Sequence, residues 1–505
     1  MPMEAREDRT RTLWRSTVEL PKFERLRANA DVDVCVIGAG IAGLSTAYLL
    51  AREGRSVLVL DDGDIGGGET GNTTAHLSNA FDDRYHQAER LFGASGARLI
   101  AASHGAAIDT IEEIATRERI ACDFARLDGY LFARPDGEAA LREEERAARA
   151  AGIDVTFTHD PPYDVFRTGP ALRFPDQARF HPLKYLAGLA EAVNARNRVC
   201  TGTKVTAVHG GERVRIETEG GATVTAAACV VATNAAITDM VQTHAKSAPY
   251  RTFVVAITVP KGSVPDALYW DDSDPYYYIR LQPGPDIDYL IVGGEDHKTG
   301  QEHDGAERLE RLERWTRERF PMAGALVYAW SGQVVEPDDA VAFIGPNPDG
   351  TENVYIIMGD SGQGMTHGTL GALLLTDLIQ GRPNEWAELY DPRRITAGAA
   401  KEYLAQNLNV VAQYADYIRP GEVSTAEEVA AGSGCIMRRG GRLLAVYRDP
   451  DGFVHERSAV CTHMKCIVAW NDLEKSWDCP FHGSRFDPYG RVLNGPAIEE
   501  LGAAE

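Results

Sequence analysis

One short segment near the N-terminus limits the folds available to this chain more than any other feature does. Residues 34–37 (VCVI) form an apolar run typical of a buried parallel strand, and a G-x-G-x-x-G turn (GAGIAG) follows directly. In that turn Gly38 permits a tight bend, Gly40 lets the backbone approach a pyrophosphate, and Gly43 lets the next helix pack against the strand. A second apolar strand ends at Asp61, whose carboxylate we expect to accept a hydrogen bond from a ribose hydroxyl. The segment therefore predicts a Rossmann-type βαβ unit that binds a dinucleotide.

Three later segments rich in small residues favour FAD as that dinucleotide. Residues 66–76 (GGGETGNTTAH) suit a loop that wraps a ribityl chain, and residues 230–234 (VVATN) resemble a strand-and-turn segment of flavoproteins. In residues 359–368 (GDSGQGMTHG) a helix N-terminus would point free N–H groups at the flavin pyrimidine and stabilise negative charge there. Beyond the turn glycines and Asp61, the residues expected to contact FAD are Thr73, Thr74, Ala75, Val205, Thr233, Gly359, Gly364, Met365 and Thr366.

These four segments, in this order, resemble the D-amino-acid-oxidase-like family of FAD-dependent amine oxidoreductases, which includes glycine oxidase and sarcosine oxidase. The resemblance covers about residues 30–385. It implies an enzyme that oxidises the C–N bond of an amine or amino acid by hydride transfer to flavin N5. It also implies a β-rich substrate domain interleaved with the flavin-binding segments.

Candidates for substrate contact follow from the same resemblance. In several members of the family an arginine on the substrate sheet pairs with a substrate carboxylate, and the corresponding residue here is Arg280. Strand alternation places Tyr276, Tyr278 and Arg280 on one face, which could equally be a sheet face half in solvent. His76 and His367 belong to segments expected to line the flavin, and each could contact substrate or hold its loop. Hydride transfer from a neutral amine needs no side-chain base, so no catalytic acid or base is assigned.

Cysteine and histidine pairs near the C-terminus predict an iron–sulfur centre. Cys461 and His463 are one residue apart, and after fifteen intervening residues Cys479 and His482 complete the pattern C-x-H…C-x-x-H. Two cysteines and two histidines could bind zinc tetrahedrally. The C-x-H spacing, however, is tighter than in common zinc knuckles, and it is typical of Rieske [2Fe-2S] sites.

The resemblance to Rieske domains extends over about residues 425–505, including residues 483–487 (GSRFD). It implies that the two thiolates hold one iron and the two imidazoles the other. Disulfide-bearing members have a cysteine where Phe481 stands, so Cys466 is expected to be a free thiol. High-potential members have a tyrosine where Phe486 stands, whereas Ser484 is retained. With fewer hydrogen bonds to sulfur, we expect a potential in the lower or middle part of the range of about −150 to +300 mV.

The chain of 505 residues is too long for a single core. The predicted fold class is α/β, with a Rossmann-type FAD-binding domain, an interleaved β-rich substrate domain and a small all-β C-terminal Rieske domain. Helices are expected over residues 86–118, 138–151 and 305–319. The expected divisions are 1–90, 181–244 and 331–385 for the FAD-binding domain, 91–180 and 245–330 for the substrate domain, 386–424 for a connector and 425–505 for the Rieske domain.

Charge and hydropathy exclude several classes of partner. A net charge of −22 argues against nucleic acid and anionic membranes, since both need a basic face. No apolar run approaches the roughly 18–20 residues of a membrane span. The N-terminal residues alternate in charge and show no secretory signal, and four of the eight cysteines are scattered in apolar surroundings. These features predict a cytoplasmic protein.

Together the two halves predict a dehydrogenase of an amine or amino acid, in which electrons leave FAD one at a time through the cluster to an external, ferredoxin-like carrier. One alternative is a reductase with the reverse flow, from such a donor to an imine or alkene. Another is a non-enzymatic electron-transfer component of an oxygenase system. A Rieske oxygenase itself is disfavoured, because the sequence shows no 2-His-1-carboxylate iron site.

The cluster assignment predicts a spectroscopic signature. The purified, reduced protein should show the near-axial EPR signal of a Rieske centre, and His463→Cys or His482→Cys should change or abolish that signal, because the histidines set its electronic structure. An anaerobic preparation that contains zinc and no iron would contradict the assignment.

Overall fold

The strand that precedes the glycine turn lies at the centre of a parallel sheet. The computed structural model describes residues 11–238, 242–400, 403–404, 406, 417 and 420–504. In it β1 (Ala30–Ile37) pairs in parallel with both β2 (Val57–Leu60) and β10 (Thr223–Asn234). A Cβ atom at Gly43 would lie 1.9 Å from the carbonyl oxygen of Gly38. The close packing of helix on strand therefore requires glycine there, as the sequence predicted.

This first sheet has eight strands, in the order β16-β17-β10-β1-β2-β7; β9 also pairs with β10, and β8 pairs with β9. Its remaining strands are β7 (Arg198–Cys200), β8 (Val205–His209), β9 (Val214–Thr218), β16 (Phe343–Pro346) and β17 (Val354–Met358). The associated helices are α2 (Leu13–Ser16), α3 (Ile41–Arg52), α6 (Pro182–Asn194), α8 (Gly364–Ile379) and α9 (Ala387–Tyr390). Helices α3 and α8 pack against each other, so the glycine turn and the helix start after β17 lie at one end of the sheet.

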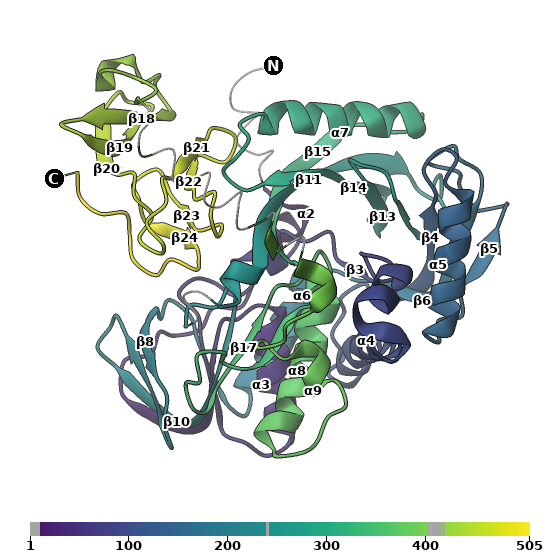
Figure 1. Cartoon of the computed structure of the whole chain (residues 1–505), viewed down its shortest axis with the longest axis horizontal. Helices are drawn as coiled ribbons and strands as arrows, with labels where there is room; N and C mark the ends of the chain where they lie inside the picture. The colour runs from purple at the N-terminus through teal and green to yellow at the C-terminus, as the bar shows by residue number, and fades with distance from the viewer. Residues whose placement is uncertain are drawn as a thin grey trace.

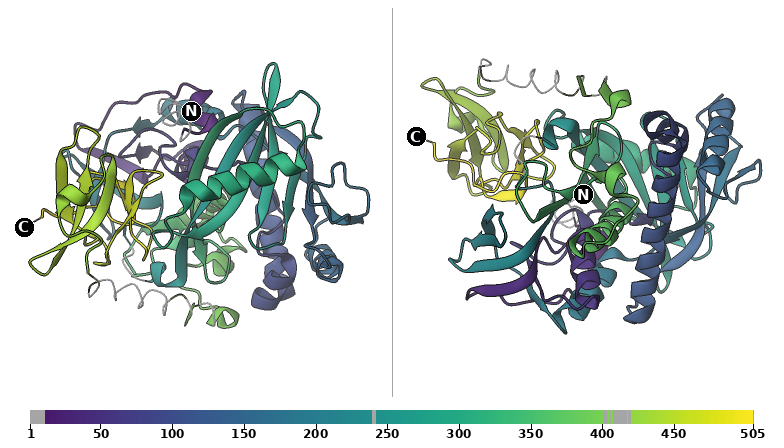
Figure 2. Two further views of the ribbon diagram at one scale, coloured as in Figure 1. Left: turned by 90° about the horizontal axis from the view of Figure 1, so that it is seen from above. Right: turned by 60° about the horizontal axis from the view of Figure 1, so that its bottom comes forward.

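A second, nine-stranded sheet is built from segments interleaved with the first. Its order is β15-β11-β14-β13-β12-β4-β6-β3, with β5 paired to β6. The strands are β3 (His76–Leu77), β4 (Ala125–Phe132), β5 (Thr156–Thr158), β6 (Ala171–Arg179), β11 (Ser247–Pro260), β12 (Leu268–Asp271), β13 (Tyr277–Pro283), β14 (Ile287–Lys298) and β15 (Leu326–Pro337). Helix α7 (Gly305–Arg319) lies across one face of this sheet (Figure 2), and Leu309, Leu312 and Trp315 face its apolar core. Helices α4 (Tyr85–Arg117) and α5 (Glu138–Ala150) pack together at the far side of the molecule from the C-terminal domain (Figure 1).

The C-terminal domain is all-β, as predicted. One sheet contains β18 (Ser433–Arg439), β19 (Arg442–Arg448) and β20 (Val454–Ser458), and the other contains β21 (Ala469–Asn471), β22 (Ser476–Asp478), β23 (Arg485–Phe486) and β24 (Val492–Asn494). Short 3₁₀ turns lie at η2 (Glu69–Gly71), η3 (His244–Lys246), η4 (Ala397–Ala399) and η6 (Ala426–Glu428).

The mixed fold class is confirmed, and so are the three predicted helices. The division into domains remains a proposal. The two sheets follow it closely, except that β3, from the segment 1–90, pairs with β6 of the second sheet. Part of the connector at 386–424, chiefly residues 407–416, lies outside the described residues. Among the residues that the structure describes, no helix is long and apolar enough to cross a membrane.

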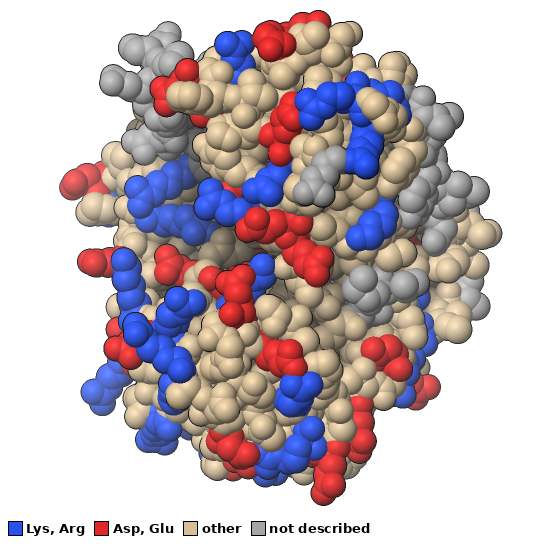
Figure 3. Space-filling model, turned by 90° about the vertical axis from the view of Figure 1, so that its left-hand side faces the viewer, with Lys and Arg blue, Asp and Glu red and all other residues tan. Residues whose placement is uncertain are grey.

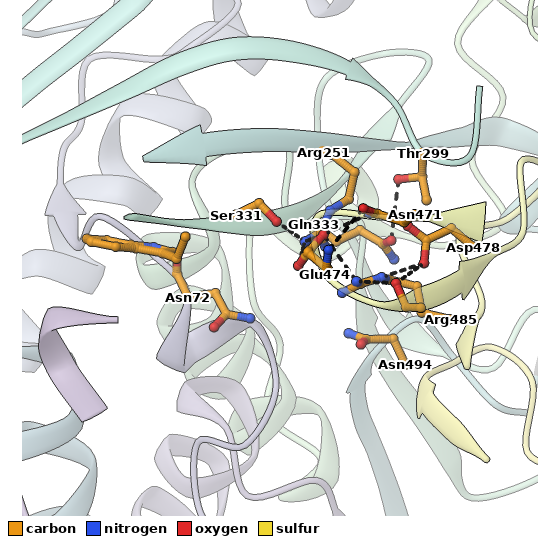
Figure 4. A network of polar contacts seen from close by, with 12 residues as sticks. Asn72, Arg251, Thr299, Ser331, Gln333, Asn471, Glu474, Asp478, Arg485 and Asn494 are labelled. Carbon is orange, nitrogen blue, oxygen red and sulfur yellow. Dashed lines mark hydrogen bonds and ion pairs between the residues drawn. The ribbon is translucent and has the colours of Figure 1, made fainter. Parts of the chain in front are cut away.

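Buried charges join the C-terminal domain to the second sheet (Figure 4). Arg251 on β11 is 1% exposed, and its Nη2 donates to both carboxylate oxygens of Glu474, at 2.5 and 2.6 Å. Glu474 also pairs with Arg485 at 3.1 Å, and Arg485 pairs with Asp478 at 2.9 Å. Breaking a buried pair on one side leaves the other charge uncompensated, at a cost of about 3–5 kcal/mol. This network therefore fixes how the domain docks.

We expect Glu474→Ala to lower the free energy of unfolding by about 3–5 kcal/mol, because Arg251 then stays buried without its carboxylate. Urea unfolding followed by tryptophan fluorescence measures this, since Trp470 and Trp477 are buried in the C-terminal domain. Glu313→Ala, which removes an exposed ion pair with Arg317, is the control and should change stability by less than about 0.5 kcal/mol. Equal effects of the two substitutions would show that the buried network does not hold the domain.

Candidate active site

A cavity of about 550 Å³ lies where the three parts of the chain meet. Figure 3 shows a hollow on the face where the C-terminal domain meets the first sheet. The predicted FAD contacts that line the cavity are Gly38, Gly40, Asp61, Thr73, Thr74, Val205, Thr233, Gly364, Met365 and Thr366. Gly43, Ala75 and Gly359 lie outside the lining. The C-terminal domain contributes Val492, Leu493, Asn494, Gly495, Ala497 and Ile498 to the same wall.

Two helix N-termini at this cavity suit a flavin dinucleotide. Helix α3 begins after Gly40 and helix α8 after Gln363, and neither of these N-cap residues makes a side-chain hydrogen bond to its helix. A Cβ atom at Gly38 would lie 2.5 Å from the carbonyl oxygen of Ala232, so the turn can pack against β10 only with glycine there. The N–H of Ile41 donates to Thr70 Oγ1 at 3.2 Å, and the dipoles of the two helices favour anionic groups such as a pyrophosphate and the flavin pyrimidine. The cavity therefore fits FAD.

Asp61 lies at the dinucleotide end, where the sequence predicted a ribose contact. Its two carboxylate oxygens accept from the backbone N–H of Ala39 at 2.6 Å and of Gly63 at 2.8 Å. Burial raises the pKa of Asp61 to about 6. Since each oxygen has a second lone pair, the carboxylate can still accept from a ribose hydroxyl.

Both predicted histidines line the cavity and are held neutral by burial. His76 bonds Thr74 through Nδ1 at 3.0 Å, and burial lowers the pKa of His76 to about 3. His367 donates from Nδ1 to the carbonyl oxygen of Asp360 at 2.7 Å, and its Nε2 has no hydrogen-bond partner among the described residues. Burial also lowers the pKa of His367 well below its usual value. Contact of either ring with substrate stays a prediction.

The structure contradicts the predicted role of Arg280. Tyr276 and Tyr278 line the cavity, with ring centroids 5.4 Å apart. Arg280 follows them on the strand but is fully buried outside the lining, and its Nη1 donates to the carbonyl oxygens of Thr74, Ala75 and Phe180, at 3.2, 2.7 and 3.0 Å. The guanidinium therefore holds the loop that wraps the cavity and does not face a substrate carboxylate.

The four predicted cluster ligands come together at the edge of the C-terminal domain. Cys461 and Cys479 are buried, and so are His463 and His482, whose Nδ1 atoms lie 3.2 Å apart. The hydroxyl of Ser484 hydrogen-bonds the Cys461 thiol. A pair of thiols and a pair of imidazoles from two loops is the donor set of a Rieske cluster, which these residues would hold. Cys466 is a free thiol, as predicted.

His244 is a residue that the sequence reasoning missed. Its ring centroid lies 5.3 Å from those of both cluster histidines, and its Nε2 bonds the carbonyl oxygen of Ala236 at 3.0 Å. The histidine edge of the cluster site is therefore turned toward the flavin-binding part. No local motif marks His244, because the contact forms only when the domains dock.

Comparisons with known proteins agree with both halves. The family described as FAD dependent oxidoreductase (DAO) matches residues 33–378, and the Rieske [2Fe-2S] domain matches residues 420–504. The putative Rieske 2Fe-2S iron-sulfur protein YhfW of Bacillus subtilis is 30% identical over 497 residues, covering 97% of this chain and 96% of that protein. Gamma-glutamylputrescine oxidoreductase of Escherichia coli is 28% identical over 382 residues, covering 71% of this chain and 86% of that protein.

Solved structures share the fold of the flavin part. Glycine oxidase from Geobacillus kaustophilus superimposes with a TM-score of 0.61 and 18% identity, covering 73% of this chain and 100% of that chain. L-proline dehydrogenase from P. horikoshii gives a TM-score of 0.60 and 19% identity, covering 73% and 98%.

We expect Arg280→Met to lower the free energy of unfolding by about 3–5 kcal/mol and to weaken FAD retention, because buried carbonyls of the cavity loop lose their donor. Thermal melts and FAD titration of the apoprotein measure the two effects. Arg173→Met, which removes an exposed pair with Asp128, is the control and should change stability by less than about 1 kcal/mol. A stable Arg280→Met variant that has lost only affinity for carboxylates would restore the substrate role.

Proposed function

Because the chain belongs to the DAO family of FAD-dependent oxidoreductases and ends in a Rieske [2Fe-2S] domain, we propose that it is a dehydrogenase of amines or amino acids. In this proposal electrons leave one at a time through the cluster to an external one-electron carrier. When bound, FAD accepts a hydride from the carbon next to nitrogen, and the cluster takes up single electrons. The neutral amine that loses the hydride becomes an iminium ion, which water hydrolyses.

One observation carries the proposal: a single cavity is walled by the flavin loops and by the Rieske segment 492–498. Asn494 donates from Nδ2 to Glu69 Oε1 at 2.8 Å, and Gln333 donates from Nε2 to the carbonyl oxygen of Gly483 at 3.0 Å. These bonds hold a ligand-bearing loop of the cluster site against the flavin-binding part. These contacts between the C-terminal domain and the cavity support electron transfer between flavin and cluster.

The two histidines at the cavity carry no positive charge that could protonate a substrate amine. Both His76 and His367 stay neutral, so neither supplies a proton to the amine. None of the eight cysteines, all of which lie among the described residues, forms a disulfide, which fits the reducing cytoplasm as the proposed location.

Anaerobic mixing of the protein with a panel of amines and amino acids tests the direction in which electrons flow between substrate, flavin and cluster. Substrate should bleach the flavin of the wild-type protein and then produce the Rieske EPR signal. Cys479→Ser should keep the bleaching but lose the signal, and its turnover with a ferredoxin-like carrier should fall at least about tenfold because a cluster ligand is missing.

Cys435→Ser is the matched control, since Cys435 lies on β18 of the same domain and is not a ligand. Full carrier turnover by Cys479→Ser would contradict an exit through the cluster. Reduction of the flavin by the carrier, with no bleaching by any amine, would favour the reductase instead. Deleting residues 425–505 is a poorer test, because it would uncover Arg251.

A further inference from the structure

The charged side chains that line the cavity are mostly acidic. They are Asp61, Asp62, Glu69, Asp82, Asp360 and Lys204. Lys204 lies beside Val205, at the dinucleotide end. Among the described residues, no arginine and no second lysine lines the cavity. A substrate carboxylate bound away from the dinucleotide end would therefore find no cationic side chain.

Aromatic rings and an unpaired carboxylate lie together at the other end. Tyr276, Tyr278 and Trp270 line the cavity there, and Asp82 joins them from the loop before α4. The Asp82 carboxylate makes no hydrogen bond or ion pair with any described residue, and its charge acts on both tyrosines. A Cβ atom at Gly362 would lie 2.7 Å from Asp82 Oδ2, so the carboxylate packs directly on the loop that leads into α8.

A second carboxylate supports the same end of the cavity. Asp296 on β14 also acts electrostatically on Tyr276 and Tyr278, and its Oδ1 is closed to solvent without a hydrogen-bond partner. Burial raises the pKa of Asp296 to about 7, and it raises the pKa of Asp82 as well. Arg84 acts on Asp82 and Arg308 acts on Asp296 in the opposite direction, toward the charged form, but neither guanidinium forms an ion pair with these carboxylates among the described residues.

The nearby arginines are engaged with protein groups. Arg84 donates to the carbonyl oxygens of Asp82 and Asp271, and Arg308 pairs with Asp304 at 2.6 Å. Arg280 is bound to the cavity loop, as described above. None of these guanidinium groups reaches the cavity wall.

We propose that this site selects amines that carry no carboxylate next to the reacting carbon, with Asp82 and the rings of Tyr276 and Tyr278 as the cation-binding subsite. An ammonium group can lie over aromatic faces and pair with a carboxylate, whereas a substrate carboxylate would be repelled. The subsite also favours the positive charge that forms on nitrogen when hydride leaves the neutral amine. The inference rests on the proposed function and narrows its substrate class.

A matched pair of unreactive ligands tests the subsite in the FAD-loaded protein. Benzyltrimethylammonium and benzoate have the same ring and opposite charge, and each perturbs the flavin absorbance if it binds beside the flavin. We expect the cation to bind at least about tenfold more tightly than benzoate. Asp82→Asn should weaken cation binding at least about tenfold and leave benzoate unchanged or tighter, because it removes the negative charge without changing the shape.

Asp83→Asn is the matched control, because Asp83 is the next residue in the chain but does not line the cavity. This substitution should change cation binding less than about threefold. The inference would be overturned if benzoate bound the wild-type protein as tightly as the cation does, or if the cation did not change the flavin absorbance. This comparison needs only the wild-type protein, so it holds even if Asp82→Asn does not fold. Faster bleaching by phenylalanine than by phenethylamine would overturn it too. Failure of every amine and amino acid to bleach the flavin would instead overturn the proposed dehydrogenase.

Discussion

The buried charge of Arg251 is the constraint on which the arrangement of this molecule depends. A guanidinium that is 1% exposed needs a carboxylate, and Glu474 supplies it from another domain. The free energy at stake, about 3–5 kcal/mol, is a large part of the stability of a typical domain. This pair therefore stabilises the docked Rieske domain, whose segment 492–498 forms part of the wall of the flavin cavity.

The contact between the Rieske domain and the rest of the molecule explains the identity of residues that the cluster by itself would not require. Gly483 follows the ligand His482 and has φ +75°. A Cβ atom there would lie 2.6 Å from Pro249 and 2.7 Å from Gln333 Nε2, both in the second sheet. The same glycine thus serves the ligand loop and the contact between domains. His244, between Ala236 and the two ligand histidines, completes that contact on the flavin side.

Sequence reasoning succeeded where the chemistry is local in the chain. Gly38, Gly43 and the predicted ligand pairs follow short spacings within one turn or one loop; the structure packs Gly43 against Gly38 and brings His463 and His482 together, while their role as ligands stays a prediction. Arg280 shows the limit of this reasoning. Strand alternation correctly placed Arg280 on the same side of the sheet as Tyr276 and Tyr278. Alternation cannot predict, however, which other segment of the chain packs on that side. The loop around Ala75, distant in sequence, covers Arg280 and takes its hydrogen bonds. Asp82, His244 and Glu474 were missed for the same reason, since their partners come from other segments.

The positive and the negative electrostatic potential in the cavity come from different kinds of group, helix N-termini for the first and carboxylate side chains for the second. Its positive end groups are chiefly the N-termini of α3 and α8, each equivalent to roughly half an elementary charge. These suit the phosphates and the flavin pyrimidine, which the protein contacts through backbone. Its negative groups are side chains such as Asp82, which face the tyrosine pair. One cavity can therefore hold an anionic cofactor at its helix N-termini and present carboxylates near the tyrosine pair, because the two sets of groups lie at different places in its wall.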